Sequence, residues 1–146
     1  MENNSGRQYP QLPQVAVGAI VIKDNRVLLV KRGKAPSNGQ WAIPGGRVEL
    51  GETLQEAVER ELLEETNIEI NAGEPAYCFD VIVRDDRDRV QYHYVIIDLK
   101  AEYVSGEVQR GDDAVEAAWI SANEIASLPV NRTTRHVLRN VIGFIG

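Results

Sequence analysis

Three glutamates of one predicted helix are placed where a helix built only for packing would carry apolar residues. In a helix over residues 54–66 each residue advances by about 100° around the axis, and four apolar residues then share one stripe: Leu54, Ala57, Val58 and Leu62. Glu61 and Glu65 fall inside this stripe, and Glu64 falls at its edge beside Arg60. Burying an unpaired carboxylate is costly, so these carboxylates must face a cation, for which a divalent metal ion is the leading candidate. The alternative is an acidic helix face in contact with water, with Arg60 as an ion-pair partner.

The charges are distributed unevenly along the chain. Residues 47–69 contain eight Glu and two Arg, a local charge equal to the formal net charge of −6 of the whole chain. Residues 1–44 contain six Lys or Arg against two acidic residues. A basic flank beside an acidic helix suits an anionic substrate bridged by metal ions, whereas the acidic overall balance argues against a nucleic acid polymer as partner.

The length and the cysteine count limit the architecture. A chain of 146 residues can form one domain with a proper core, and we expect an N-terminal tail over residues 1–13 and a single domain over residues 14–146. The single cysteine, Cys78, excludes an intramolecular disulfide and a cysteine-based zinc site, and we expect it to be a buried thiol. No apolar run approaches membrane-spanning length and the first residues are polar, so we expect a cytoplasmic protein with no membrane partner.

The rest of the chain alternates apolar segments with turns. Five segments are rich in β-branched or alternating apolar residues and are predicted strands: 15–22, 26–30, 76–83, 90–99 and 116–120. Turns at residues 23–25 and 84–89 predict two hairpins. Residues 102–114 are predicted to be a long polar loop, and residues 123–127 and 131–142 are predicted helices. Because strands outnumber the helices that flank them, we expect an α+β fold with a mixed central sheet.

The segment from Gly46 to Ile68, GRVELGETLQEAVERELLEETNI, resembles the Nudix box. This box is the signature of a family that hydrolyses nucleoside diphosphates linked to another moiety. Further segments resemble the family's opening strands and its closing strand and helix: residues 17–21, 27–32, 41–46, 118–120 and 124–125. The resemblance covers about residues 14–142 and implies the Nudix α/β/α sandwich.

The sequence departs from the box at Asn67, where the family usually has glycine. Asparagine is the next-best residue for the left-handed conformation that ends many helices, so we expect the helix to end there. Thr53, followed three residues later by Glu56, predicts a capping box at the other end of the helix.

The resemblance implies a magnesium site at this helix. It implies that Glu61 and Glu65 bind Mg²⁺ together with the backbone carbonyl group of Gly45 or Gly46, and that Mn²⁺ can substitute. It also implies that Glu64 is shared between ions or acts on water. Mg²⁺ prefers hard oxygen ligands, and carboxylates spaced three and four residues apart share one helix face.

The resemblance assigns supporting roles to two further residues of the box. Arg60 is expected to orient the neighbouring glutamates, and Glu52 is expected to hold the preceding loop against the helix. We therefore count both with Glu61 and Glu64 as candidate catalytic residues.

Other candidates lie outside the box. Asp113 matches a position at which some relatives place a metal ligand or a base, and the alternative is a loop acid without such a role. Lys31 and Arg32 are candidates to bind phosphate groups, although each of them, taken alone, is more often an ordinary surface charge. Tyr77 and Phe79 are candidates to stack on a base, although alternating aromatic residues in a strand are more often part of a core.

The resemblance implies a Mg²⁺-dependent enzyme that hydrolyses a pyrophosphate bond, with ADP-ribose or a related nucleotide sugar as the favoured small-molecule substrate. The alternative is a nucleoside triphosphate pyrophosphohydrolase that sanitises oxidised nucleotides of the 8-oxo-dGTP type. A third hypothesis is a non-catalytic nucleotide-sensing module, against which the presence of every glutamate of the box argues. Many members of the family form homodimers, so a homodimer is one expected assembly, although no residue of the sequence indicates it.

Overall fold

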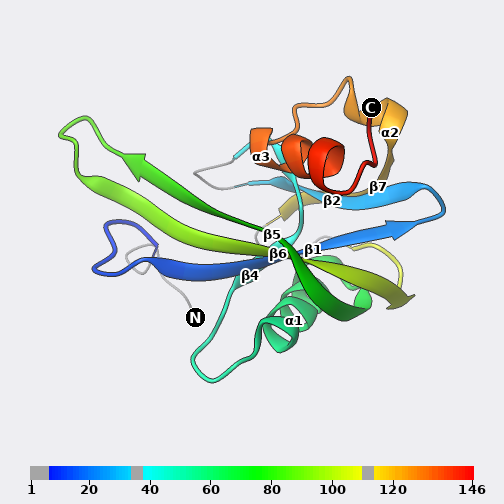
Figure 1. Cartoon of the computed structure of the whole chain (residues 1–146), viewed down its shortest axis with the longest axis horizontal. Helices are drawn as coiled ribbons and strands as arrows, with labels where there is room; N and C mark the ends of the chain where they lie inside the picture. The colour runs from blue at the N-terminus through cyan, green and yellow to red at the C-terminus, as the bar shows by residue number, and fades with distance from the viewer. Residues whose placement is uncertain (1–6, 34–37, 110–113) are drawn as a thin grey trace.

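The computed structural model describes residues 7–33, 38–109 and 114–146 (Figure 1). Seven strands form one sheet: β1 (Gln14–Lys23), β2 (Arg26–Arg32), β3 (Trp41–Ala42), β4 (Gly45–Arg47), β5 (Glu69–Arg84), β6 (Val90–Ser105) and β7 (Ala114–Ser121). The helices are α1 (Leu54–Thr66), α2 (Ala122–Ile125) and α3 (Arg132–His136), and a π-helical segment, Val137–Val141, follows the last of them.

The sheet is mixed, as the sequence predicts. Its main path runs β3-β2-β1-β6-β5, with β4 paired to β1 and β7 paired to β2. β1 and β6 are parallel, and the other pairs are antiparallel. The helix α1 covers one face of this sheet, and α2, α3 and the C-terminal segment cover the other (Figure 1). The α+β sandwich is thereby confirmed.

Each face of the sheet has its own core. The core on the α1 side includes the predicted apolar stripe of that helix, of which Ala57, Val58 and Leu62 have no exposed surface. The core on the other side contains Trp41 and Ile43 together with Ile125 of α2. Alternate residues of β1 supply both cores, because successive side chains of a strand point to opposite faces.

Both ends of α1 follow the sequence prediction. The hydroxyl oxygen of Thr53 accepts a hydrogen bond from the amide of Glu56 at 3.1 Å, and the Glu56 carboxylate accepts one from the amide of Thr53 at 2.9 Å. Asn67 ends the helix with φ at 65°, in the left-handed region. Both predictions are confirmed.

The predictions for the second half of the chain were partly wrong. Residues 102–105 are not loop but the end of β6, because they pair with the start of β5, which itself begins at Glu69. The predicted helix over residues 131–142 is α-helical only over Arg132–His136, and then widens into the π-helical segment. Cys78 is exposed rather than buried, because β5 is an edge strand and Cys78 points to the face opposite Tyr77 and Phe79.

No helix among the described residues is both long and apolar enough to cross a membrane.

Candidate functional site

Two glycines bring the backbone of β4 into contact with its neighbours. A Cβ atom on Gly46 would lie 2.2 Å from the Glu61 carboxyl group, and one on Gly45 would lie 1.9 Å from the carbonyl oxygen of Val17. Real Cβ atoms do not come so close, so only glycine lets the Glu61 carboxylate pack directly on this strand. The structure therefore brings the predicted Gly46 and Glu61 together.

Arg60 connects the loop before α1 to the helix itself. Its Nε and Nη2 atoms donate hydrogen bonds to the two carboxylate oxygens of Glu52 at 2.7 and 2.9 Å. This is a bidentate arginine–carboxylate pair. Nη1 donates to Glu61 at 3.1 Å, and Nη2 also donates to the carbonyl oxygen of Arg47 at 3.1 Å. The hydrogen bond from Arg60, followed by one from the backbone amide of Glu49, lowers the pKa of Glu52 to about 2.

The three central glutamates lie in different environments. Glu65 is 7% exposed, accepts a hydrogen bond from the amide of Gly45 at 3.1 Å and forms a short ion pair with Arg32. Glu61 is 22% exposed, and its burial raises the pKa of its carboxyl group. Glu64 is 60% exposed and reaches Arg60 at 3.5 Å. The helix thus presents a buried carboxylate at Glu65, a half-buried one at Glu61 and an exposed one at Glu64.

These oxygen atoms are the donors that a hard divalent cation prefers. Within the described part of the chain, no three or more His, Cys, Asp or Glu side chains are already gathered in a group that could hold a metal, and arginines pair with the carboxylates of α1. Arg32 pairs with Glu65, and Arg60 pairs with Glu61. The residues fit a cation by their chemistry, and a cation bound there would compete with Arg32 for Glu65.

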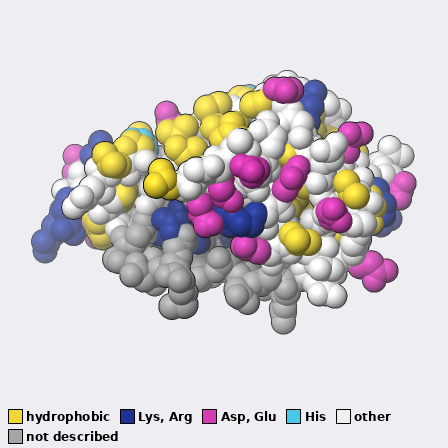
Figure 2. Space-filling view, turned by 90° about the horizontal axis from the view of Figure 1, so that it is seen from below, with side chains coloured by type: hydrophobic (Ala, Val, Ile, Leu, Met, Phe, Trp, Pro, Cys, Tyr) yellow, Lys and Arg dark blue, Asp and Glu magenta, His cyan; other side chains and the backbone are white. Residues whose placement is uncertain are grey.

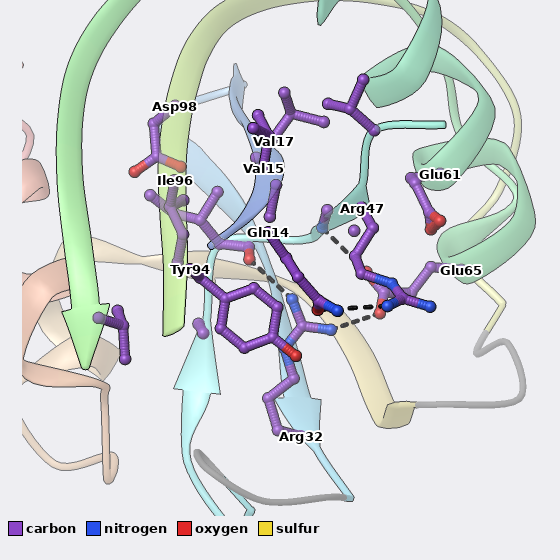
Figure 3. A pocket seen from close by; sticks show the side chains of 18 of the residues that line it. Gln14, Val15, Val17, Arg32, Arg47, Glu61, Glu65, Tyr94, Ile96 and Asp98 are labelled. Carbon is purple, nitrogen blue, oxygen red and sulfur yellow. Dashed lines mark hydrogen bonds and ion pairs between the residues drawn. The ribbon is translucent and has the colours of Figure 1, made fainter. Parts of the chain in front are cut away.

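The glutamates lie at one end of an open cavity of about 1360 Å³. Arg32 and Arg47 line the same end (Figure 3). The wall formed by paired residues of β5 and β6 is largely apolar and includes Phe79, Val81 and Ile96, while Tyr94 of the same wall lies nearer the arginines (Figure 3). On the face seen from below, where α1 lies, basic side chains gather directly beside acidic ones (Figure 2). A ligand with a charged part and an apolar part would match this division.

Only some of the candidate residues outside the Nudix box line the cavity. Arg32 and Phe79 line the cavity, but Lys31 and Tyr77 do not. The Tyr77 ring packs against Phe79 and His136, with centroids 5.7 and 5.3 Å apart, and so belongs to the core beside α3. Asp113 lies outside the described residues.

The polar residues of the cavity that the sequence analysis did not assign to a site include Arg47, Asp98 and Asn131. Asp98 lies on the same face of β6 as Tyr94 and Ile96, and is only 4% exposed. A charged residue inside an apolar strand was the signal for it. Asn131, the first residue of the predicted helix over 131–142, caps α3, since its side chain accepts hydrogen bonds from the amides of Thr133 and Thr134. It also lines the cavity, a second role for which the sequence offers no signal.

Comparison with known proteins gives consistent matches. The family model described as the NUDIX domain matches residues 12–141. The chain is 40% identical over 116 residues to a protein named ADP-ribose pyrophosphatase from Methanocaldococcus jannaschii. The aligned residues make up 80% of this chain and 66% of that protein, so the chain spans just under two thirds of the length of that relative. It is 33% identical over 129 residues to the nucleoside triphosphatase NudI of Salmonella arizonae, covering 82% and 90% of the two chains. The crystal structure of a MutT NUDIX hydrolase from Burkholderia pseudomallei superposes with a TM-score of 0.76 at 29% identity, covering 90% of this chain and 99% of that one.

Proposed function

The chain belongs to the Nudix family, a class of enzymes that act on pyrophosphate bonds, and we propose that it hydrolyses the pyrophosphate bond of a nucleoside diphosphate linked to another moiety. ADP-ribose or a related nucleotide sugar is the favoured substrate, because the relative named ADP-ribose pyrophosphatase is 40% identical over 116 residues. The observation that carries the proposal is the division of the cavity between carboxylates with arginines at one end and an apolar wall at the other.

We assign a divalent cation, Mg²⁺ with Mn²⁺ as a substitute, to Glu61, Glu65 and the carbonyl group of Gly45 or Gly46, with Glu64 beside them. Two features of the structure support this assignment. The Glu61 carboxyl group packs directly on Gly46, and the negative charges of Glu64 and Glu65 oppose its ionisation in addition to its burial. A bound cation polarises a phosphoryl oxygen and lowers the pKa of a bound water molecule.

The protein side chains have separate tasks in this proposal. Arg60 holds Glu61 in position, and Glu52 holds Arg60 through both carboxylate oxygens. Arg32 donates to Glu65 and to the carbonyl oxygen of Ile43, and since a guanidinium group has five N–H donors, others remain for a phosphate oxygen. Glu64 is the most exposed of the three glutamates, and we assign it to the proton of the attacking water.

The second candidate function is the hydrolysis of nucleoside triphosphates, including oxidised ones. The relative named nucleoside triphosphatase NudI favours it, because the chain covers 90% of that protein. The two functions share the same carboxylates and differ in what the rest of the cavity binds.

The test is a substrate panel incubated with the full chain and Mg²⁺, in which the released products are identified. The panel contains ADP-ribose, other nucleotide sugars, dinucleotides, and normal and oxidised nucleoside triphosphates. We expect AMP and ribose phosphate from ADP-ribose, and a loss of roughly 100-fold or more in kcat for Glu64→Gln, the range seen for a residue that handles a proton. Glu74→Gln is the matched control, since Glu74 is exposed and does not line the cavity.

Turnover confined to triphosphates, yielding monophosphate and pyrophosphate, would replace the first function by the second. Tight binding of one compound without turnover of any would show that the protein is a nucleotide-sensing module.

A further inference from the structure

A buried carboxyl group lies at the apolar end of the cavity. Asp98 of β6 pairs in register with Gly18 of β1, and it lines the cavity beyond Tyr94 and Ile96 (Figure 3). A Cβ atom on Gly18 would lie 2.5 Å from Oδ1 of Asp98. The missing side chain of Gly18 therefore leaves the space in which this carboxyl group sits.

Asp98 has no partner among the described residues. No hydrogen bond or ion pair joins it to any of them, although it is only 4% exposed. Among the described, non-exposed residues, every side-chain nitrogen or oxygen atom that is completely buried has a hydrogen-bond partner. The Asp98 oxygens have none, so they must keep a small accessible surface, and the cavity is the open space beside them. Burying an unpartnered carboxyl group is costly, and this cost is offset when a ligand in the cavity supplies the partner.

The surroundings of Asp98 favour its neutral form. Burial alone raises the pKa of Asp98 to about 7. Its register partners on the adjoining strands are Gly18 and Tyr77, and no charge on a described residue contributes to the shift. A protonated carboxyl group offers one donor and one acceptor side by side, so it pairs with a ligand edge that also has one of each.

The rest of this wall fits a flat ring. Phe79 and Val81 of β5 lie opposite Ile96 and Tyr94 of β6 on the same face of the sheet, and such walls commonly bind the planar part of a ligand while a few polar groups fix its orientation. Adenine has the matching edge, in which a ring nitrogen accepts and the neighbouring amino group donates. Guanine presents two adjacent donors instead, which suit an ionised carboxylate.

We propose that Asp98 determines which base the cavity accepts, by forming two hydrogen bonds with the donor and acceptor edge of an adenine-type ring. The inference rests on the proposed function, because it names the part of the nucleotide that this end of the cavity recognises. It makes Asp98 a specificity residue distinct from the carboxylates of α1.

The test measures binding rather than turnover. Isothermal titration in Mg²⁺ compares AMP, GMP, IMP and ribose 5-phosphate on the full chain and on two variants. We expect the wild type to prefer AMP, and Asp98→Leu, which has a similar shape but no polar group, to bind AMP roughly 10- to 100-fold more weakly, the value of two hydrogen bonds. Ribose 5-phosphate, which has no base, should bind both proteins equally. Asp80→Asn is the matched control, since Asp80 is an exposed aspartate of the neighbouring strand that does not line the cavity.

Asp98→Asn separates recognition from a structural role. Its amide keeps one donor and one acceptor at every pH, so it should bind AMP as well as the wild type does at pH 6. At pH 8.5, where Asp98 is mostly ionised, the wild type should bind AMP about 30-fold more weakly than Asp98→Asn does, given the pKa of about 7.

Three results would overturn the proposal: an unchanged AMP affinity in Asp98→Leu, a preference of the wild type for GMP, or a wild-type to Asn ratio that does not change with pH. Failure of the proposed function is seen separately, because monophosphate binding requires no hydrolysis. A base preference that depends on Asp98 in a protein that does not cleave ADP-ribose would leave this inference standing and remove the proposed substrate.

Discussion

The buried carboxyl group of Asp98 makes the stability of the fold depend on pH. Burial raises its pKa from 3.8 to about 7, so between these values the folded state binds more protons than the unfolded state. Stability from this group is therefore fully present below about pH 4 and is lost as the pH rises to about 7. A shift of about three pKa units corresponds to roughly 4 kcal/mol as an upper value.

Asp98→Asn removes this dependence, because an amide does not ionise. We expect the free energy of unfolding of the variant to exceed that of the wild type by about 2–4 kcal/mol at pH 8, and the difference to vanish near pH 4. Urea denaturation at several pH values measures it. A difference that stays constant with pH would show that Asp98 does not titrate in this range.

At the level of single residues, the sequence predicts which side chains of one helix lie together better than it predicts which polar side chains are buried. The glutamates of α1 are spaced so closely that one helix period brings them to one face, and in the structure Glu61, Glu64 and Glu65 line the same cavity. Asp98 and Gly18 are 80 positions apart and meet only through the parallel pairing of β1 and β6. Neither the residue types nor the local spacing predicts the pairing of β1 with β6.

At the level of elements, α1 must end at a residue that tolerates a positive φ. Asn67 adopts φ 65° there, and its side-chain amide donates to the carbonyl oxygen of Glu107 at 3.1 Å. We expect Asn67→Ala to lower the free energy of unfolding by about 1–2 kcal/mol, because alanine lacks the short polar side chain that lets asparagine tolerate the left-handed conformation and loses the hydrogen bond to Glu107.

Asn67→Gly is the matched variant. Glycine relieves the backbone strain but loses the side-chain hydrogen bond and gains entropy in the unfolded chain, so we expect a change within about 0.5 kcal/mol. Thermal and urea denaturation of both variants distinguish them. Equal stability of the alanine and glycine variants would mean that the end of α1 rearranges freely.

The existence of elements was easier to predict than their lengths. Capping residues are local signals, which explains why both ends of α1 agree with the prediction. The extension of β6 through residues 102–105 depends instead on the partner strand, since Tyr103 pairs with Ile70 and its ring packs on Trp119 and Lys23. Polar residues in a paired strand resemble a loop when only the local sequence is considered. For the π-helical turn after α3 we find no sequence signal.

At the scale of the whole molecule, the candidate cation site joins separate parts of the fold. Glu65 links α1 to β2 through Arg32 and to β4 through the amide of Gly45, and Glu61 packs on Gly46. A cation that binds these groups only when they are assembled stabilises the folded state by mass action, by about 2.7 kcal/mol at a concentration 100 times the Kd. For a chain of 146 residues this corresponds to a rise in Tm of roughly 5–10 °C.

Glu61→Gln separates binding from general stability, because its two effects have opposite signs. Removing a half-buried carboxylate whose pKa is raised by burial should leave the Tm without cation equal or higher, whereas the rise on adding Mg²⁺ should be lost. Thermal denaturation with EDTA and with increasing Mg²⁺ measures both, and Glu74→Gln should respond as the wild type does. If Glu61→Gln and the wild type gained the same stability from Mg²⁺, the cation would be bound elsewhere, and the carboxylates of α1 would be held in the folded protein by groups that include Arg60, Arg32 and the amide of Gly45.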